Sequence, residues 1–263
     1  MTILDKIVLR KREEVALAKQ LVSAAELEKA ANFERTPYVF KDFLLDAQRT
    51  GIIAEFKRKS PSKGIINNQV SVAEVTSAYA SAGASALSVL TDVDFFGGHA
   101  KDLLEARAHN NIPVLRKDFM IDEYQVLEAK AWGADIILLI AAILTPQEIA
   151  NLAGMAKGLG LNVLLEVHNQ EELDRSICKD LDAIGVNNRN LADFTVNIQT
   201  SFDLVDRIPN EFMKISESAI SEAKTIGLLK KAGFNGFLIG ENFMKTPDPG
   251  AAIRSFVSEL ISV

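Results

Sequence analysis

Beyond residue 50, short apolar runs alternate with longer amphipathic stretches. Eight apolar runs have the length of a strand, and they begin at residues 51, 86, 113, 135, 162, 183, 212 and 236. The stretches between them have helical spacing, and several end in glycine, as helix C-termini prefer: 71–83, 122–133, 145–160 and 221–233. Strands that alternate with helices lie parallel and are joined by right-handed crossovers. Eight such units predict an α/β fold, a (β/α)8 TIM barrel, in preference to an open doubly wound sheet.

The first fifty residues do not follow this repeat. Their spacing predicts two or three helices, at 3–22, 23–32 and 40–48. We expect these helices to cap the barrel or to help form its mouth. The whole chain, 1–263, is expected to be a single barrel domain in which 1–50 is a helical N-terminal extension.

Composition and charge exclude several classes of protein. With 48% hydrophobic and 24% charged residues and a net charge of -6, the chain has the composition of a soluble globular protein and lacks the basic excess of a nucleic-acid binder. The longest apolar run, 136–144, is too short to span a membrane. Charges interrupt the N-terminus, which argues against a signal peptide, and the single cysteine, Cys178, allows no internal disulfide. We therefore expect a cytoplasmic protein, as a monomer or weak homodimer.

Polar residues gather where the predicted strands run into their following loops. The first run ends in "EFKRKSPSKG", and alternation places Glu55 and Lys57 on the same face of that strand. Four other strands end in polar residues, namely Lys117, Glu166, the Asn187 and Arg189 pair, and the Glu217 and Ser218 pair. A lone charge in a strand is usually a satisfied ion pair, but five strands converge at this end of a barrel. Lysine and glutamate in a partly desolvated pocket are suited to proton transfer.

The ends of the last two strands predict a phosphate site. They read "SESAIS" and "LIGENFMKTPDPG", and backbone N–H groups there, with a short helix beginning near Glu241, would bind an anion. A plain strand and turn is the alternative reading of the last segment. Residues 95–98, "FFGG", follow the second predicted strand. The two phenylalanines predict an aromatic wall beside the mouth of the barrel, and the two glycines predict a mobile hinge.

Metal and nucleotide sites find no support in the sequence. His99, His109 and His168 show no ligand spacing with one another or with the cysteine, and we expect them in loops or on helix faces. No glycine-rich dinucleotide loop or Walker loop follows any strand. We therefore expect no metal and no cofactor.

Seven segments together resemble the indole-3-glycerol phosphate synthase family of tryptophan biosynthesis. They are "IIAEFKRKSPSKG", "ALSVLTDVDFFGG", "VLRKDFMIDEYQV", "GADIILLI", "LLEVHN", "IGVNNRNL" and "FLIG", and the resemblance covers nearly the whole chain. It implies a carbon–carbon lyase (carboxy-lyase) that closes the ring of 1-(2-carboxyphenylamino)-1-deoxyribulose 5-phosphate, with loss of carbon dioxide and water and without a cofactor. The implied partner is this small anionic substrate, with no nucleic acid and no membrane.

The resemblance also implies roles for the strand-end residues. Lys117 is expected to act as the general acid toward the substrate carbonyl, and Glu166 to take part in the later proton transfer. Lys57 is expected to contact anionic groups, including the phosphate, and to assist as an acid, while Glu55 holds the lysines in position. Asn187 and Glu217 are expected to bind the hydroxyl or ring-nitrogen side of the substrate.

Further residues are implied to bind the substrate. Phe96 and Phe119 would pack the anthranilate ring, and Ser60 with Arg189 would lie near its carboxylate. The phosphate would be held by the backbone at four positions, namely Ser218, Ala219, Gly240 and Glu241.

Three residues depart from the family pattern. Ala219 stands where glycine is common, His99 where a serine often follows "FFGG", and Glu241 where a small residue is frequent. We expect Ala219 to keep a negative φ and to point its N–H toward the phosphate, because a positive φ is costly for alanine.

Two other readings remain open. One is another phosphosugar barrel, such as a phosphoribosyl isomerase or a tryptophan synthase α-subunit, which would not be expected to carry the lysines of "KRKSPS" and "RKDF". The other is a non-catalytic protein that binds a phosphate ligand, which should have lost Lys117 or Glu166. The chain keeps both residues.

Overall fold

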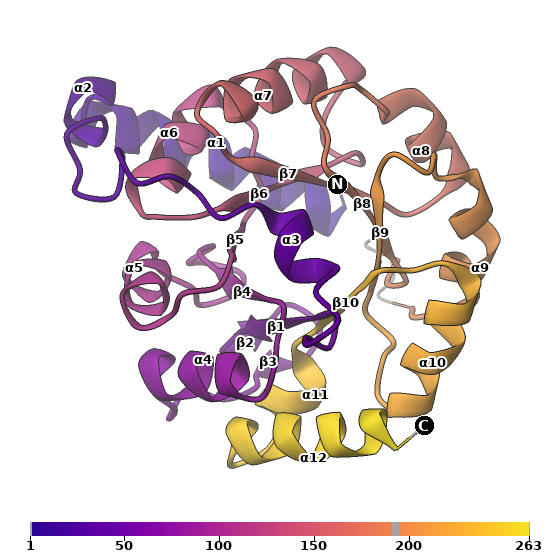
Figure 1. The fold of residues 1–263 in the computed structure, drawn as a ribbon. Coiled ribbons are helices and arrows are strands. Elements are labelled where there is room, and N and C mark those ends of the chain that lie inside the picture. Colours follow the sequence, from indigo (N-terminus) through magenta and orange to yellow (C-terminus); the bar gives the residue numbers. More distant parts are fainter. Residues whose placement is uncertain (1, 191–194, 263) are drawn as a thin grey trace.

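The computed structural model describes residues 2–190 and 195–262. Eight parallel strands close into a barrel in the order β1-β10-β9-β8-β7-β6-β5-β4, which confirms the predicted fold (Figure 1). These strands are β1 (Ile52–Phe56), β4 (Ala86–Leu90), β5 (Val114–Lys117), β6 (Ile136–Ile140), β7 (Asn162–Val167), β8 (Ala183–Asn187), β9 (Met213–Glu217) and β10 (Gly236–Ile239). Each of them lies within one of the eight predicted runs.

Helices surround the barrel and follow its strands in turn. They are α4 (Val72–Ser81), α5 (Ala100–His109), α6 (Glu123–Ala131), α7 (Pro146–Gly158), α8 (Gln170–Ser176), α9 (Gln199–Leu204) with the 3-10 turn η1 (Val205–Arg207), α10 (Ala223–Ala232), α11 (Glu241–Met244) and α12 (Pro249–Ile261). Side chains of Ser71, Asp122 and Thr145 cap the N-termini of α4, α6 and α7 by accepting backbone N–H groups. Within the described residues, no helix is long and apolar enough to cross a membrane.

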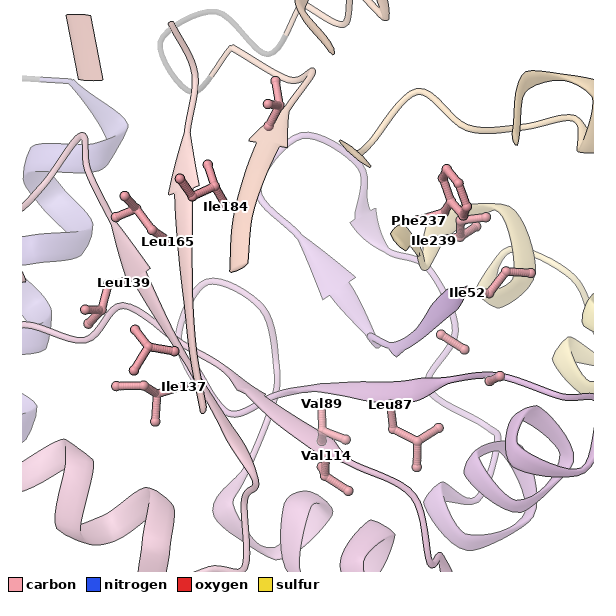
Figure 2. Close-up of a cluster of buried hydrophobic side chains, with 14 of the residues drawn as sticks. Ile52, Leu87, Val89, Val114, Ile137, Leu139, Leu165, Ile184, Phe237 and Ile239 are labelled. Atoms are coloured by element: carbon pink, nitrogen blue, oxygen red, sulfur yellow. The ribbon is translucent and has the colours of Figure 1, made fainter. Parts of the chain in front are cut away.

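Side chains alternate between the barrel interior and the layer beneath the helices. On β6, Ile137 and Leu139 pack outward, whereas Ile136, Leu138 and Ile140 pack inward. Figure 2 shows part of the outward layer, with side chains from several strands. Full burial of such a side chain stabilises the fold by ~1.5–3 kcal/mol. The same alternation turns every second residue at the strand ends into the barrel.

The N-terminal extension contacts both ends of the barrel. It consists of α1 (Ile3–Leu21), α2 (Ala24–Leu27) and α3 (Phe40–Leu44). α3 closes the end where the strands begin: Phe40 and Leu44 pack into the interior cluster, and the N–H of Phe40 donates to Asn162 Oδ1 at the start of β7. α1 lies at the opposite end, where its Ile7 packs into the same cluster. In Figure 1, α3 lies in front of the barrel and α1 is fainter behind it. The extension therefore both caps the barrel and borders its mouth.

Two local elements differ from the sequence predictions. The helix predicted at 23–32 is a single turn, α2, because hydrogen-bonded turns replace it from Lys29 to Arg35. After β1 the chain forms a small antiparallel hairpin, β2 (Lys59–Ser60) and β3 (Gly64–Ile65), which is not among the eight predicted strands. Pro61 lies in the turn between these two strands, and Gly64, with a φ of 68°, begins β3.

A buried aspartate joins the extension to the barrel. Asp135, just before β6, is fully buried. Its Oδ1 accepts from Arg35 Nη2 and from the N–H of Tyr38, each at 2.7 Å, and its Oδ2 accepts from Arg107 Nη1 and from the N–H of Val114, each at 2.8 Å. Both carboxylate oxygens are therefore fully used.

We expect Asp135→Ala to lower the free energy of unfolding by about 3–5 kcal/mol, because it leaves a buried arginine and two backbone donors without their acceptor. Denaturation in urea measures this loss. Lys157→Ala is the control: its ion pair with Asp182 is exposed, so its removal should cost less than about 1 kcal/mol. Equal losses in the two variants would contradict the role given to Asp135.

Candidate active site

The inward-facing residues at the strand ends line one pocket. It contains all six predicted catalytic residues and the four predicted to bind the rest of the substrate, namely Glu55, Lys57, Lys117, Glu166, Asn187, Glu217, Ser60, Phe96, Phe119 and Arg189. Each catalytic side chain owes its direction to strand alternation, since the residues two positions earlier also face the barrel interior. The predicted convergence is therefore present in the structure.

Lys117 lies between two buried carboxylates. Its Nζ donates to Glu166 Oε2 at 2.7 Å and to Glu217 Oε2 at 3.1 Å. The three residues come from β5, β7 and β9. Lys117 thus bridges two strands that are not its neighbours in the barrel.

The three groups have different pKa shifts. Burial would lower the pKa of Lys117, but Glu166 and Glu217 outweigh it and raise this pKa, so the ammonium form persists at neutral pH. Burial would raise the pKa of Glu166, but Lys117 and His168 outweigh it and lower this pKa. For Glu217, burial dominates and raises the pKa to about 7. The pocket therefore holds one ammonium group, one carboxylate that stays ionised at neutral pH, and one carboxyl group that titrates near neutral pH.

Two glycines make room for the carboxylates. A Cβ at Gly185 would lie 2.2 Å from Glu217 Oε1, and a Cβ at Gly240 would lie 2.5 Å from Glu55 Oε1. No real Cβ approaches an oxygen so closely. These glycines are therefore needed for close approach.

Glu55 contacts one of the two lysines that it was predicted to position. Its Oε1 lies 2.7 Å from Lys57 Nζ, and its Oε2 accepts from Ser88 Oγ at 3.4 Å. Lys117 is held by Glu166 and Glu217 instead. Glu55 acts on Lys117 through its negative charge, which helps to raise the pKa of Lys117.

His168 is a member of the site that sequence reasoning missed. It follows β7 in a loop, as expected, but its Nε2 lies 3.3 Å from Glu166 Oε1 and its Nδ1 lies 3.0 Å from Glu172 Oε2. Burial would lower its pKa, but the two glutamates outweigh it and raise it to about 10. After Lys117, His168 is therefore a second positively charged group beside the Glu166 carboxylate. The available signal was its position two residues after Glu166, on a strand end already expected to be catalytic.

The predicted substrate-binding residues form the rim of the pocket. The ring centroids of Phe96 and Phe119 lie 5.9 Å apart. The Oγ of Ser60 is buried and has no hydrogen-bond partner within the described part of the chain. Arg189 Nη2 lies 3.4 Å from Glu241 Oε2.

The five residues predicted to bind phosphate line a second hollow, which adjoins the first. They are Lys57, Ser218, Ala219, Gly240 and Glu241. The short helix α11 begins at Glu241, as predicted.

The prediction that Ala219 keeps a negative φ is wrong. Ala219 has a φ of 62° and Ser218 a φ of 65°, so two consecutive residues adopt the left-handed conformation. Side chains from β8 and its loop hold this turn: Ser218 Oγ donates to Asn187 Oδ1 at 2.9 Å, and Asn188 Nδ2 donates to Glu217 O at 2.9 Å. Tertiary contacts thus override the local cost that the prediction relied on.

The remaining histidines lie away from these hollows. His99 precedes α5 as its N-cap residue, and His109 ends that helix. Throughout 2–190 and 195–262, no three His, Cys, Asp or Glu side chains are grouped so that they could hold a metal ion. Leu191, the last residue of one motif used in the sequence analysis, lies outside the described residues.

Comparison with known proteins identifies the family. The family model of indole-3-glycerol phosphate synthase matches residues 4–256. The chain is also 47% identical over 258 residues to the indole-3-glycerol phosphate synthase of Bacteroides thetaiotaomicron, and the match covers 98% of each chain. The chain belongs to the indole-3-glycerol phosphate synthase family. This membership confirms the predicted carboxy-lyase of tryptophan biosynthesis.

Solved structures outside the family share the fold. A chain of the tryptophan synthase complex of Pyrococcus furiosus matches with a TM-score of 0.62 at 17% identity, covering 82% of this chain and 100% of that chain. A 3-hexulose-6-phosphate synthase matches with a TM-score of 0.60 at 15% identity, covering 80% and 99%. At such identities, the likeness concerns the barrel alone.

The raised pKa of Glu217 predicts a pH effect on stability. Between its ordinary pKa of 4.5 and its folded pKa of about 7, the folded state binds more protons than the unfolded state, so stability falls as pH rises. We expect the wild type to lose roughly 3 kcal/mol relative to Glu217→Gln between pH 4.5 and pH 8. Urea denaturation across this range measures the difference. The other titrating groups are common to both proteins, so their contributions cancel. A stability difference between the wild type and Glu217→Gln that stays constant with pH would contradict the raised pKa of Glu217.

The left-handed Ala219 predicts a stabilising substitution. Ala219→Gly should raise the free energy of unfolding by about 0.5–1 kcal/mol, because glycine adopts a positive φ without steric cost. The control is Ala251→Gly on an exposed helical position of α12, which should lower this free energy by about 1 kcal/mol. Thermal and urea denaturation compare the two. A loss of stability in Ala219→Gly would argue against the observed backbone conformation.

Proposed function

We propose that this chain closes the indole ring of 1-(2-carboxyphenylamino)-1-deoxyribulose 5-phosphate, releasing carbon dioxide and water. The observation that carries the proposal is the position of Lys117, which contacts Glu166 and Glu217 in a pocket walled by Phe96 and Phe119. Family membership supports the reaction, and the pocket supports the assignment of roles.

Ring closure requires a proton at the substrate carbonyl. As the aromatic ring attacks the ketone, negative charge develops on the carbonyl oxygen and a positive charge develops on the ring system. Lys117 is an ammonium at neutral pH, so it can donate the proton. The carboxylate of Glu166 stabilises the cation that forms. Loss of carbon dioxide then restores aromaticity in the six-membered ring.

Dehydration requires both a proton donor and a base. The new hydroxyl leaves as water after it gains a proton, and a neighbouring carbon loses a proton to a base. Glu166 takes part in this proton transfer, because His168 and Lys117 hold it in the anionic form. Asn187 and Glu217 bind the hydroxyl or ring-nitrogen side, and Glu217 can donate as well as accept at neutral pH.

Binding uses both hollows. The anthranilate ring packs against Phe96 and Phe119, with its carboxylate near Arg189 and the unpartnered hydroxyl of Ser60. Lys57 lines both hollows, so it can contact anionic groups of the substrate and assist as an acid. The phosphate is held in the second hollow by Lys57 and by the backbone at Ser218, Ala219, Gly240 and Glu241.

The proposal includes the remaining properties expected from the sequence. The chain forms a single domain with a helical extension, works without metal or cofactor as a monomer or weak homodimer, and acts in the cytoplasm. It binds one small anionic substrate and neither nucleic acid nor membrane. A phosphoribosyl isomerase or a non-catalytic binding protein is the alternative, and turnover distinguishes them.

The test is turnover by the purified protein. Incubated with the carboxyphenylamino substrate and a chelator, the wild type should produce indole fluorescence. Lys117→Ala should lower kcat by about 10²–10⁴-fold and change KM by less than about threefold, because a general acid acts in the transition state. Lys157→Ala, on the outer surface, is the control and should match the wild type.

Three results would contradict the proposal. Folded wild type that binds the substrate without turnover would favour a binding protein. Activity that appears only after metal is added would contradict the cofactor-free mechanism. A Lys117→Ala variant with raised KM and unchanged kcat would make Lys117 a binding residue.

A further inference from the structure

α1 carries a buried lysine at the mouth of the barrel. Lys11 is only 3% exposed, although lysine side chains usually reach solvent. Its Nζ lies 2.9 Å from Asp92 Oδ2, 2.9 Å from Asp118 Oδ1 and 2.6 Å from Glu14 Oε2. Asp92 follows β4 and Asp118 follows β5, so one ammonium group joins the extension to two loops at the active-site end.

Both aspartates accept hydrogen bonds from the backbone N–H groups of phenylalanines beside the pocket. Asp92 Oδ1 accepts from the N–H of Phe95 at 2.9 Å and from the N–H of Phe96 at 3.1 Å. Asp118 Oδ1 accepts from the N–H of Phe119 at 2.8 Å. The rings of Phe96 and Phe119 face the pocket as a pair. The two carboxylates therefore connect this pair to α1.

Lys11 supplies charge that Asp92 obtains from no other described residue. Asp118 also pairs with Arg116 and accepts from Thr91 Oγ1. Asp92 is fully buried, and within the described residues its one ion pair is with Lys11. A buried carboxylate without a cation either takes up a proton or moves toward water. Either change weakens its hydrogen bonds to the N–H groups of Phe95 and Phe96.

We propose that Lys11 is a positioning residue, which acts through Asp92 and Asp118 to hold Phe96 and Phe119 in the place where the substrate ring packs against them. The kinetic consequence rests on the proposed function, whereas the structural consequence does not. Lys117 is held by Glu166 and Glu217 independently of this network. Loss of Lys11 should therefore weaken substrate binding more than it slows the chemistry.

The experiment compares Lys11→Met with Lys19→Met. Methionine fills similar space without charge, and Lys19 is a matched control, because it also joins α1 to an aspartate, Asp122, but at an exposed position. Lys11→Met should raise KM for the carboxyphenylamino substrate about tenfold and change kcat by less than about threefold. It should also speed amide exchange at Phe95 and Phe96 about tenfold, measured by NMR without substrate. Lys19→Met should change neither quantity.

Asp92→Ala tests the same link from the other side. It removes the acceptor of the two N–H groups and leaves Lys11 paired with Glu14 and Asp118. We expect the same rise in KM, and the double variant should show no further rise, because both changes break one connection. Where Lys11→Met yields no folded protein, Asp92→Ala carries the comparison with Lys19→Met.

The outcomes separate this proposal from the proposed function. A folded Lys11→Met that melts at a lower temperature but keeps the wild-type KM and exchange rates would overturn it, since Lys11 would then only anchor α1. A large loss of kcat at unchanged KM would also overturn it. If the wild type shows no turnover, the proposed function fails, and amide exchange still decides whether Lys11 holds the loop.

Discussion

The active site depends on the balance of charge inside a closed barrel. Alternation turns the last polar residues of several strands into one pocket, where neighbouring strands exclude most of the water that would screen them. Lys117 alone cannot neutralise both Glu166 and Glu217. The structure resolves this excess in two ways: Glu217 has its pKa raised to about 7, and His168 supplies a second positive charge to Glu166. Two carboxylates in one pocket thereby acquire different protonation states.

This balance also prepares the site for its substrate. Lys117 and Lys57 form ion pairs with carboxylates, and Arg189 lies near Glu241. An anionic substrate that enters the pocket competes with these carboxylates for the three cations. Gly185 and Gly240 make this arrangement possible, because any side chain at either position would displace a carboxylate.

The sequence was informative wherever a pattern repeats, and less so where one contact decides the structure. Eight apolar runs predicted the barrel, and alternation predicted which strand-end residues meet. The role of His168 depends on its distance to Glu166, which spacing alone does not reveal. The left-handed Ala219 was mispredicted because local sterics oppose it, while hydrogen bonds around the turn, which only the fold assembles, hold it there. The burial of Lys11 could not be predicted from the helical pattern at 3–22, because the two aspartates that it contacts lie far along the chain.

The N-terminal extension divides into a part that supports the fold and a part that faces the chemistry. α3 and the Asp135 network lie where the strands begin, the end of a TIM barrel whose residues serve stability rather than chemistry. α1 lies where the strands end, and its buried lysine reaches the loops that carry the aromatic wall. The extension thus contacts the scaffold where the strands begin and, where they end, contacts through Lys11 the two aspartates that bind the backbone of Phe96 and Phe119.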